Sequence, residues 1–304
     1  MKNALIIGST CVDVIIRIDH LPKTEENLHP DSQRFAVGGC AYNVANVLMR
    51  TGTDTTFVTP VGGRGVFGDF TRKALIALGA KDYVELPEAE NGCCYCFVEK
   101  SGERTFMSIH GAEYTFDPAW MAPHAGKRFD YGYVCGLEIE ERTGDALIDY
   151  LETAPVDTIV YAPGPRGALI PRERTDRLLA LRPMLHLNEG EALALSGESG
   201  LDAAMRSLFA RTGRPVIVTR GAKGADWIDK DGLHTAPGAP CGAVVDTIGA
   251  GDAHIGATLC GLCHGMTLDR ALAMANRVSA AVVSTSGATL SDEALRAATA
   301  ELSK

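Results

Sequence analysis

The sequence alternates strand-like and helix-like runs over most of its length. "ALIIG" (residues 4–8) and "DTIVYA" (157–162) are short apolar runs typical of strands, whereas "AYNVANVLMRTG" (41–52) and "FTRKALIALG" (70–79) have helical spacing. This rhythm predicts a mostly parallel central sheet with helices on both faces. We predict that the 304 residues form a single α/β domain, residues 1–304.

Two segments break the alternation. Residues 12–18 and 33–38 resemble strands joined by a polar loop, and residues 92–109 resemble a hairpin that turns at "SGER". Neither segment can continue a parallel pattern. We therefore predict a small β-sheet lid over the main sheet, inserted at about residues 12–38 and 92–109. From residue 250 to residue 302 the sequence predicts mostly helix.

Charge and hydropathy exclude several classes of function. The formal net charge is −9 and there is no cluster of lysine and arginine, which argues against a nucleic-acid partner. No run of 18 apolar residues is present, so we expect no membrane span. We expect a small-molecule substrate instead.

The nine cysteines are scattered, mostly in apolar surroundings, which predicts reduced thiols and a cytoplasmic protein. In "GCCYCF", strand alternation places Cys93 and Cys94 on opposite faces, so the sequence favours packing over a metal site there.

The stretch "VVDTIGAGDAHIGA" (residues 244–257) places a glycine turn and Asp252 where a helix is about to start. The first turn of a helix has free N–H groups and a positive dipole end, and glycines let an anion approach them. One interpretation is a phosphate cradle, with Asp252 positioned to take a proton from a hydroxyl group. The other is a helix N-cap without a ligand.

Other polar and glycine residues also follow strand-like runs. Ligands of open α/β sheets bind at the carboxyl ends of the strands. The residues at such ends, besides the "GAGD" turn, are Asp13, Asn188, Glu191 and Gly221. Their convergence favours the cradle.

Five ordered motifs carry a resemblance to a known family. They are "GGCAYNVAN" (38–46), "GERTF" (102–106), "LNEGEA" (187–192), "VTRGAKGA" (218–225) and "DTIGAGDAHIGA" (246–257). Over essentially its whole length the chain resembles the PfkB (ribokinase-like) carbohydrate kinases. The resemblance implies a ribokinase-like α/β fold and phosphoryl transfer from ATP.

The resemblance also implies roles for the "GAGD" turn. Asp252 matches the catalytic base, which takes the proton of the substrate hydroxyl. The backbone N–H groups of Gly249, Ala250 and Gly251 match an anion hole for the transferred phosphoryl group.

For ATP and Mg²⁺, Asn188 and Glu191 match an N-x-x-E motif in which the glutamate holds Mg²⁺ through water. The alternative is a helix cap at Asn188 and a solvated Glu191. The nucleotide-binding residues implied by the family are Asn188, Thr219, Gly221, Gly224 and Asn276. Asn276 would contact adenine; alternatively it is a polar residue of a helix surface.

Some members of the family bind a monovalent cation. The matching positions here are Asp246, Gly287 and Ser291, which makes a K⁺ site possible. The alternative is that Asp246 only ties down its own loop.

The substrate side of the family site maps onto the first half of the chain. The implied substrate-binding residues are Asp13, Gly38, Gly39, Asn43, Arg104 and Glu138. A carboxylate such as Asp13 can accept hydrogen bonds from both hydroxyls of a vicinal diol, and the diglycine would let the sugar ring approach. The alternatives are a turn at Asp13, a helix cap at Asn43 and surface charges at Arg104 and Glu138.

Three features depart from the family pattern. His254 stands where an aromatic residue is common, and we interpret it as a packing residue. The loop at Arg64 and Gly65 lacks an acid that many members carry there. The signature "GGCAYN" lacks the lysine found in ribokinase proper and in phosphosugar kinases, which favours an unphosphorylated substrate.

The sequence therefore predicts an ATP-dependent sugar kinase that phosphorylates a primary hydroxyl. A nucleoside kinase of the same family is the alternative, with Tyr42, Tyr95, Phe106 and Tyr114 as candidates for base stacking. A non-catalytic sugar-binding regulator is the third possibility. Apolar alternation in the lid would also permit a homodimer through the lid strands.

Overall fold

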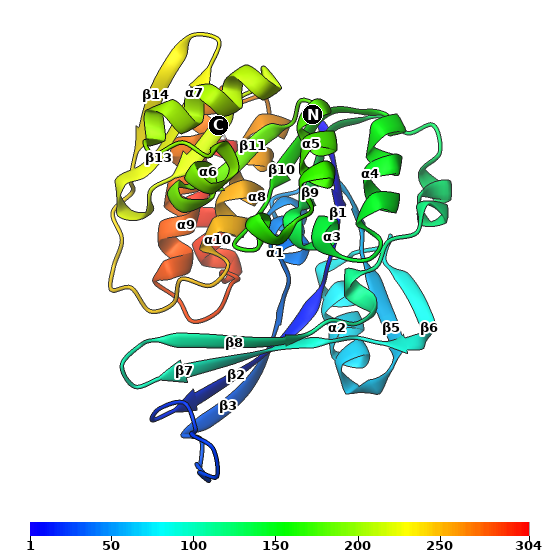
Figure 1. The fold of residues 1–304 in the computed structure, drawn as a ribbon, viewed down its shortest axis with the longest axis vertical. Helices are drawn as coiled ribbons and strands as arrows, with labels where there is room; N and C mark the ends of the chain where they lie inside the picture. Colours follow the sequence, from blue (N-terminus) through cyan, green and yellow to red (C-terminus); the bar gives the residue numbers. More distant parts are fainter. Residues whose placement is uncertain (304) are drawn as a thin grey trace.

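The computed structural model describes residues 1–303 and centres on an eight-stranded sheet (Figure 1). Across the sheet the strands follow the order β14 (Gly232–Pro237), β13 (Gly224–Asp229), β12 (Val216–Thr219), β11 (Met184–Asn188), β10 (Val156–Ala162), β9 (Phe129–Cys135), β1 (Asn3–Ile7) and β4 (Asp54–Val58). All pairings from β4 to β12 are parallel. The pairings of β12 with β13 and of β13 with β14 are antiparallel. The mostly parallel sheet predicted from the sequence is confirmed.

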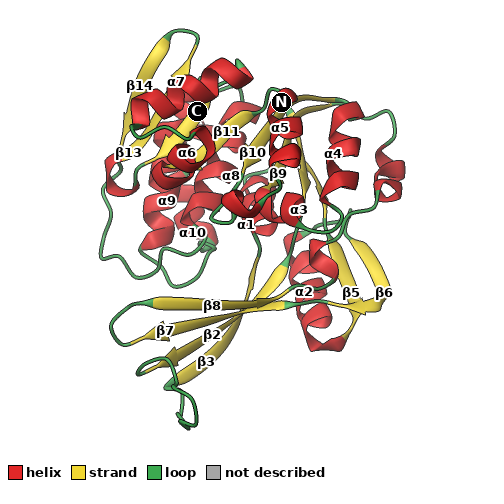
Figure 2. Cartoon of the chain, viewed as in Figure 1, coloured by secondary structure: helices red, strands yellow, loops and turns green. Residues whose placement is uncertain are grey.

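Helices cover both faces of this sheet (Figure 2). One face packs against α1 (Cys40–Arg50), α8 (Ala250–Cys263), α9 (Leu268–Val283) and α10 (Asp292–Ala298). The other packs against α3 (Gly136–Glu140), α4 (Gly144–Thr153), α5 (Arg172–Ala180), α6 (Glu189–Ser196) and α7 (Leu201–Thr212).

Strand alternation explains the two cores. In β1, Ala4 and Ile6 belong to the first core, whereas Leu5 and Ile7 belong to the second. Since successive side chains of a strand point to opposite faces, a strand buried on both faces needs a continuous apolar run, which "ALII" supplies.

The lid is a separate four-stranded sheet that projects from the main body (Figure 1). Its strand order is β3 (Ser32–Gly38), β2 (Cys11–Ile18), β7 (Cys93–Glu99) and β8 (Arg104–Ile109). The hairpin of β7 and β8 turns at residues 100–103, so the predicted lid strands and turn are confirmed. That the whole chain is one domain stays a prediction.

A further two-stranded sheet was not foreseen from the sequence. It pairs β5 (Pro60–Arg64) with β6 (Val84–Glu90) in parallel, and α2 (Gly65–Leu78) connects them. Arg64 and Gly65, where the loop departs from the family pattern, form the start of α2. Arg64 is exposed and pairs with Glu88.

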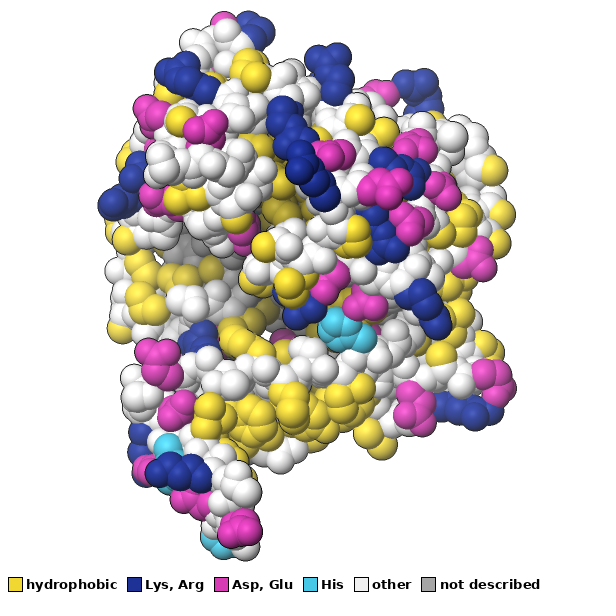
Figure 3. All heavy atoms as spheres, in the orientation of Figure 1, with side chains coloured by type: hydrophobic (Ala, Val, Ile, Leu, Met, Phe, Trp, Pro, Cys, Tyr) yellow, Lys and Arg dark blue, Asp and Glu magenta, His cyan; other side chains and the backbone are white. Residues whose placement is uncertain are grey.

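The two faces of the lid differ. The outer face packs partly on α2, where Phe35 contacts Phe67 and Phe70. Beyond α2 it exposes Met107 and Ile109, each more than half accessible, and Figure 3 shows hydrophobic atoms gathered along the lower part of this view.

None of the described helices is long and apolar enough to cross a membrane.

Candidate active site

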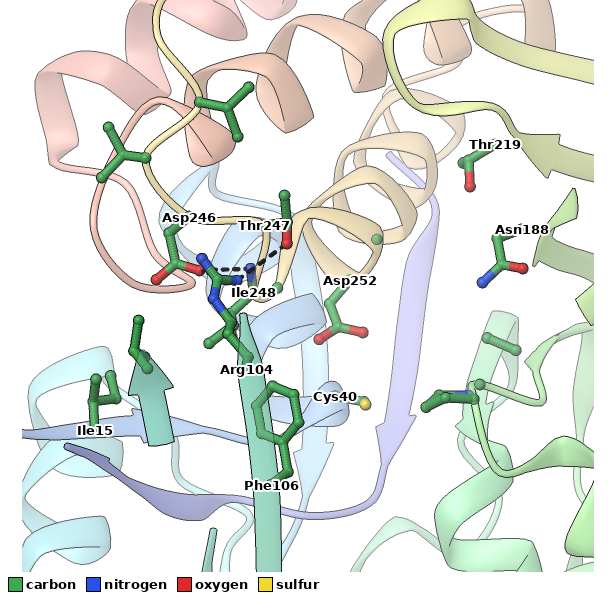
Figure 4. Close-up of a pocket in the computed structure, with 18 of the residues that line it drawn as sticks. Ile15, Cys40, Arg104, Phe106, Asn188, Thr219, Asp246, Thr247, Ile248 and Asp252 are labelled. Atoms are coloured by element: carbon green, nitrogen blue, oxygen red, sulfur yellow. Dashed lines mark hydrogen bonds and ion pairs between the residues drawn. The ribbon is translucent and has the colours of Figure 1, made fainter. Parts of the chain in front are cut away.

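A cavity of about 1190 Å³ lies between the lid and the main body. Its walls come from the inner face of the lid, from the carboxyl ends of parallel strands and from the start of α8. Arg104, Phe106, Asn188, Thr219 and Asp252 line it (Figure 4), and the hollow is open to solvent in the space-filling view (Figure 3). Of the groups predicted to converge, Asn188, Glu191 and the "GAGD" turn line this one cavity, whereas Asp13 and Gly221 are not among its lining residues.

Asp252 projects from the first turn of α8 into this cavity (Figure 4). Its Oδ2 accepts a hydrogen bond of 2.9 Å from Asn43 Nδ2, on α1. Burial raises the pKa of Asp252 to about 6, although the bonds from Asn43 and the Cys40 thiol oppose the shift. A carboxylate with such a pKa is ionised at neutral pH and is still a stronger base than an exposed aspartate.

The residue that caps α8 is Gly249, not Asp252. Gly249 has φ of +73°, and no side chain caps the helix. Within the described chain, the backbone N–H groups of Gly251 and Asp252 donate no hydrogen bond. The Ala250 N–H donates a long one, of 3.4 Å, to the Thr247 carbonyl oxygen. The interpretation of Asp252 as a mere N-cap therefore fails, and the turn has the free donors that an anion needs.

The two glycines of the turn have different surroundings. A Cβ on Gly249 would lie 2.4 Å from the Cβ of Ala288. A Cβ on Gly251 would have no other atom of the described chain within 4 Å. Gly249 thus shapes the turn, while Gly251 borders open space in the cavity.

Asp13 lies inside β2 of the lid, not beyond the end of a strand of the main sheet. A Cβ on Gly38 would lie 2.2 Å from Asp13 Oδ2, and one on Gly39, where φ is +102°, would lie 2.6 Å from the Ser9 carbonyl oxygen. The diglycine therefore makes room for Asp13 and Ser9; the space predicted for a sugar ring is taken up by protein. Burial raises the pKa of Asp13 to about 6, opposed by Arg34.

Several polar atoms around Asp252 are buried without a hydrogen-bond partner among residues 1–303: Ser9 Oγ, Asn43 Oδ1, Tyr133 Oη and Glu138 Oε2. Glu138 is only 5% exposed, so it is no surface charge, and its Oε1 accepts 2.8 Å from the Ser9 N–H. Burial raises the pKa of Glu138. Unpaired buried polar atoms are costly, so packing alone does not explain this cluster beside Asp252.

Asn188 and Glu191 form a capping box at the start of α6. Asn188 Oδ1 accepts from the Glu191 N–H at 2.8 Å, and Glu191 Oε2 accepts from the Asn188 N–H at 2.9 Å. Both also line the cavity. Burial raises the pKa of Glu191. The helix cap at Asn188, which was the alternative interpretation of the sequence, is thus present. The same hydrogen bonds hold the Glu191 carboxylate beside the cavity, where it could bind a hydrated Mg²⁺.

The predicted nucleotide loop follows β12. Thr219 lines the cavity and its hydroxyl donates 3.3 Å to the Leu187 carbonyl. Gly221 and Gly224 have φ of +57° and +94°, and a Cβ on Gly224 would lie 2.2 Å from the Ala236 carbonyl oxygen. These glycines are therefore required by the turn itself.

Asn276 is buried, not part of a helix surface. Its Nδ2 donates to the carbonyls of Ala236 and Pro237 at 3.1 and 3.0 Å, and its Oδ1 is 3.1 Å from His254 Nε2. The predicted adenine contact stays a prediction, with the amide already occupied by these protein groups.

His254 is buried, in agreement with its interpretation as a packing residue. Its Nδ1 lies 2.8 Å from His186 Nε2, so the two rings and Asn276 form a chain from β11 through α8 to α9. Burial lowers the pKa of His254 to about 4. Burial, and then the neighbouring His254, also lower the pKa of His186. Both rings are therefore neutral at neutral pH, and one donates its N–H to the other.

Asp246 anchors the lid to the main body. Its Oδ1 lies 2.9 Å from Arg104 Nη1 of β8, which also donates to the Thr247 hydroxyl at 3.1 Å (Figure 4). Gly287 donates its N–H to Asp246 at 3.3 Å, whereas Ser291 instead caps α10 at the Ala294 N–H. A monovalent cation at Asp246 would have to share the carboxylate with Arg104 or displace it.

Several residues of the site were not identified from the sequence. Cys40, Tyr133 and His186 line the cavity, and Ser9 supplies a buried hydroxyl beside Glu138. For Ser9, the sequence did contain a signal: the small polar residues Ser9 and Thr10 follow the first strand, where ligand-binding residues are common. Cys40 lies in the "GGCAYNVAN" motif, where only the two glycines and Asn43 were singled out. Tyr133 and His186 lie in apolar runs, which predict only burial.

Comparisons with known proteins agree with this arrangement. A family described as pfkB family carbohydrate kinase matches residues 1–295. An uncharacterized sugar kinase of Escherichia coli, YegV, is 32% identical over 286 residues, which cover 93% of this chain and 88% of the relative.

Two solved structures are similar in fold. The ribokinase of Thermotoga maritima has a TM-score of 0.86 at 21% identity, over 98% of this chain and 99% of the other. The nucleoside kinase of Burkholderia thailandensis in complex with inosine has a TM-score of 0.79 at 22% identity, over 97% and 95%.

The surroundings of the two glycines generate a prediction about stability. Gly249→Ala should lower the free energy of unfolding by about 1–3 kcal/mol, because it forces a left-handed alanine against Ala288. Gly251→Ala is the matched control and should change stability by less than about 1 kcal/mol. Urea unfolding of both variants measures this. Equal stabilities would show that the geometry of the turn is wrong.

Proposed function

This chain belongs to the pfkB family of carbohydrate kinases, and we propose that it transfers the γ-phosphoryl group of ATP to a primary hydroxyl of an unphosphorylated sugar. The observation that carries the proposal is the partly buried Asp252, which faces the cavity beside unpaired N–H groups of its own helix turn.

The proposed reaction uses Asp252 as general base. The sugar hydroxyl gives its proton to Asp252 Oδ1 or Oδ2 while its oxygen bonds to the γ-phosphorus, and the bond from phosphorus to the ADP oxygen breaks. The N–H groups of the 249–251 turn and of Asp252 stabilise the charge on the transferred group. Asn43 orients the carboxylate through the 2.9 Å hydrogen bond.

The sugar would occupy the space between the lid and Asp252. Asp13, Asn43 Oδ1 and Glu138 Oε2 offer acceptors, and the last two lack a partner within the described chain. Glycines 38 and 39 act indirectly by seating Asp13 and Ser9.

ATP would lie along the strand ends, with Thr219, Gly221 and Gly224 shaping its loop and Asn276 supporting β14 from behind. Mg²⁺ supplies charge neutralisation for the phosphates when bound, and Asn188 and Glu191 would hold its waters. We also propose a K⁺ site at Asp246, Gly287 and Ser291, in which Ser291 would have to leave its cap on α10 or bind through its carbonyl. A K⁺ titration that leaves turnover unchanged would remove it.

A nucleoside is the alternative substrate. Of the four aromatic candidates, Phe106 lines the cavity, Tyr42 is buried, Tyr95 packs on the outer face of the lid and Tyr114 packs against the His110 ring. Tyr133, which was not among the candidates, also lines the cavity, but the several acceptors fit a sugar better than these two rings fit a base. A non-catalytic regulator is disfavoured because the carboxylate, the turn and the capping box are all present.

Screening ADP release over free sugars, nucleosides and phosphosugars tests the substrate class. We expect a free sugar to give the highest kcat/KM. The phosphosugars are included because Arg17 and Arg34 of the lid line the cavity, which the sequence did not reveal. Preference for a phosphosugar would overturn the unphosphorylated substrate, and preference for a nucleoside would favour the alternative.

The general base generates a mutational prediction. Asp252→Asn keeps the size of the side chain but cannot take the proton, so kcat should fall by roughly 10²–10⁴. The melting temperature and ATP binding should change little. Steady-state kinetics and calorimetry on the same preparation separate the two effects, and an Asn variant with normal turnover would exclude Asp252 as the base.

The proposed role of Glu191 in binding Mg²⁺ generates a second mutational prediction. Glu191→Gln keeps an acceptor for the Asn188 N–H but removes the charge, so half-saturation of turnover should need at least about tenfold more Mg²⁺. The KM for the sugar should hardly change. Glu189→Gln is the control, because Glu189 lies two residues away on the same helix turn and is exposed. An unaltered Mg²⁺ titration in Glu191→Gln would remove this residue from the metal site.

We further propose a homodimer through the lid, because its outer face exposes apolar side chains beyond α2. Light scattering after gel filtration should give twice the chain mass. A monomer at micromolar concentration would contradict the dimer without affecting the kinase proposal.

A further inference from the structure

We propose that Asp13, Cys94 and Cys96 form a binding site for Zn²⁺ on the inner face of the lid, and that zinc bound there excludes the sugar. The metal site itself follows from the geometry of the lid. Only its inhibitory effect rests on the proposed function, in which Asp13 grips the sugar.

The pairing of two lid strands brings the three side chains together. β2 and β7 are parallel, with Asp13 opposite Cys94. Cys96 follows Cys94 by two residues, so both thiols point to the same face. One ligand atom from each of the three residues lies within 4.8 Å of the other two. Cys93 points the opposite way and packs with Val12 and Val14.

The spacing of the sulfur atoms matches a metal better than a disulfide. The Sγ atoms of Cys94 and Cys96 are 3.7 Å apart. Two thiolates at about 2.3 Å from a tetrahedral Zn²⁺ are separated by roughly 3.8 Å, so little rearrangement is needed. A disulfide needs about 2.05 Å between the sulfurs and a strained geometry along one strand.

The site is accessible to an ion. Cys96 is buried, whereas Cys94 and Asp13 are only partly buried, so an ion can reach them. Binding releases the thiol protons to the solvent, and the affinity should therefore rise with pH.

The site faces the substrate cavity. Ile15 and Val98, two residues beyond Asp13 and Cys96 on the same face of their strands, both line it. With three protein ligands, zinc keeps a fourth position for water. An ion held there occupies the Asp13 carboxylate, which can then no longer accept hydrogen bonds from a sugar.

Binding of Co²⁺ to the purified protein, kept reduced, tests the site without any enzyme assay. We expect a thiolate-to-cobalt charge-transfer band at one equivalent, which Zn²⁺ displaces. Cys94→Ser and Cys96→Ser should each weaken binding by at least about 100-fold, since a direct ligand matters more than the outer-shell groups whose loss costs 10–100-fold. Cys241→Ser removes an exposed thiol elsewhere and should bind normally.

The kinetic arm measures inhibition by Zn²⁺ at saturating Mg²⁺. We expect inhibition competitive with the sugar and not with ATP, relieved by a zinc-selective chelator and lost in Cys94→Ser, which should keep its turnover without zinc.

Absence of the charge-transfer band, or an equal band in Cys94→Ser, would overturn the site. Inhibition relieved by reductant alone would indicate a Cys94–Cys96 disulfide instead and overturn it too. A normal band in a protein that phosphorylates no sugar would contradict the proposed function alone.

Discussion

The hydrogen bond from Asn43 to Asp252 is the contact around which the cavity is arranged. It joins α1, which follows the lid, to α8, which follows the glycine turn. The two helices can approach because Gly256 of α8 has no side chain: a Cβ there would lie 2.9 Å from the Val44 carbonyl oxygen. This close packing partly buries the carboxylate, and burial is what raises its pKa. Position and basicity of Asp252 therefore have the same structural origin.

The lid is held over this carboxylate by a second long-range contact. Arg104 of β8 reaches Asp246, which precedes the glycine turn, and Asp246 also accepts N–H bonds from Ile248 and Gly287. A largely buried pair of this kind orders both partners, since breaking it leaves a charge without a counterpart. The same loop thus positions the N–H groups of the turn and fixes the strand opposite them. The sugar-facing and phosphate-facing halves of the cavity are coupled through it.

The sequence predicted the parallel sheet, the lid strands and the gathering of Asp252, Asn188 and Glu191 at one edge, because these follow from local periodicity and from motifs. It was wrong to place Asp13 at that edge, since Asp13 lies within a lid strand. It missed the hairpin of β13 and β14, although "DKDG" is an available turn signal. It also could not foresee partners far apart in the chain, such as His186 with His254 or Asp13 with Cys94. Strand register and helix packing create those contacts, and neither is visible in a local pattern.

The pH dependence of kcat/KM for the best substrate tests the central claim most directly, because it reports the essential base of the free enzyme. If Asp252 is that base, kcat/KM should rise about tenfold per pH unit below about pH 6 and level off above it, as the raised pKa requires. The pKa of Asp13 is also raised to about 6, so the same profile must be recorded for Asp13→Asn, in which the acid limb should persist. A profile that is flat through pH 6, or an acid limb that disappears in Asp13→Asn, would contradict the account.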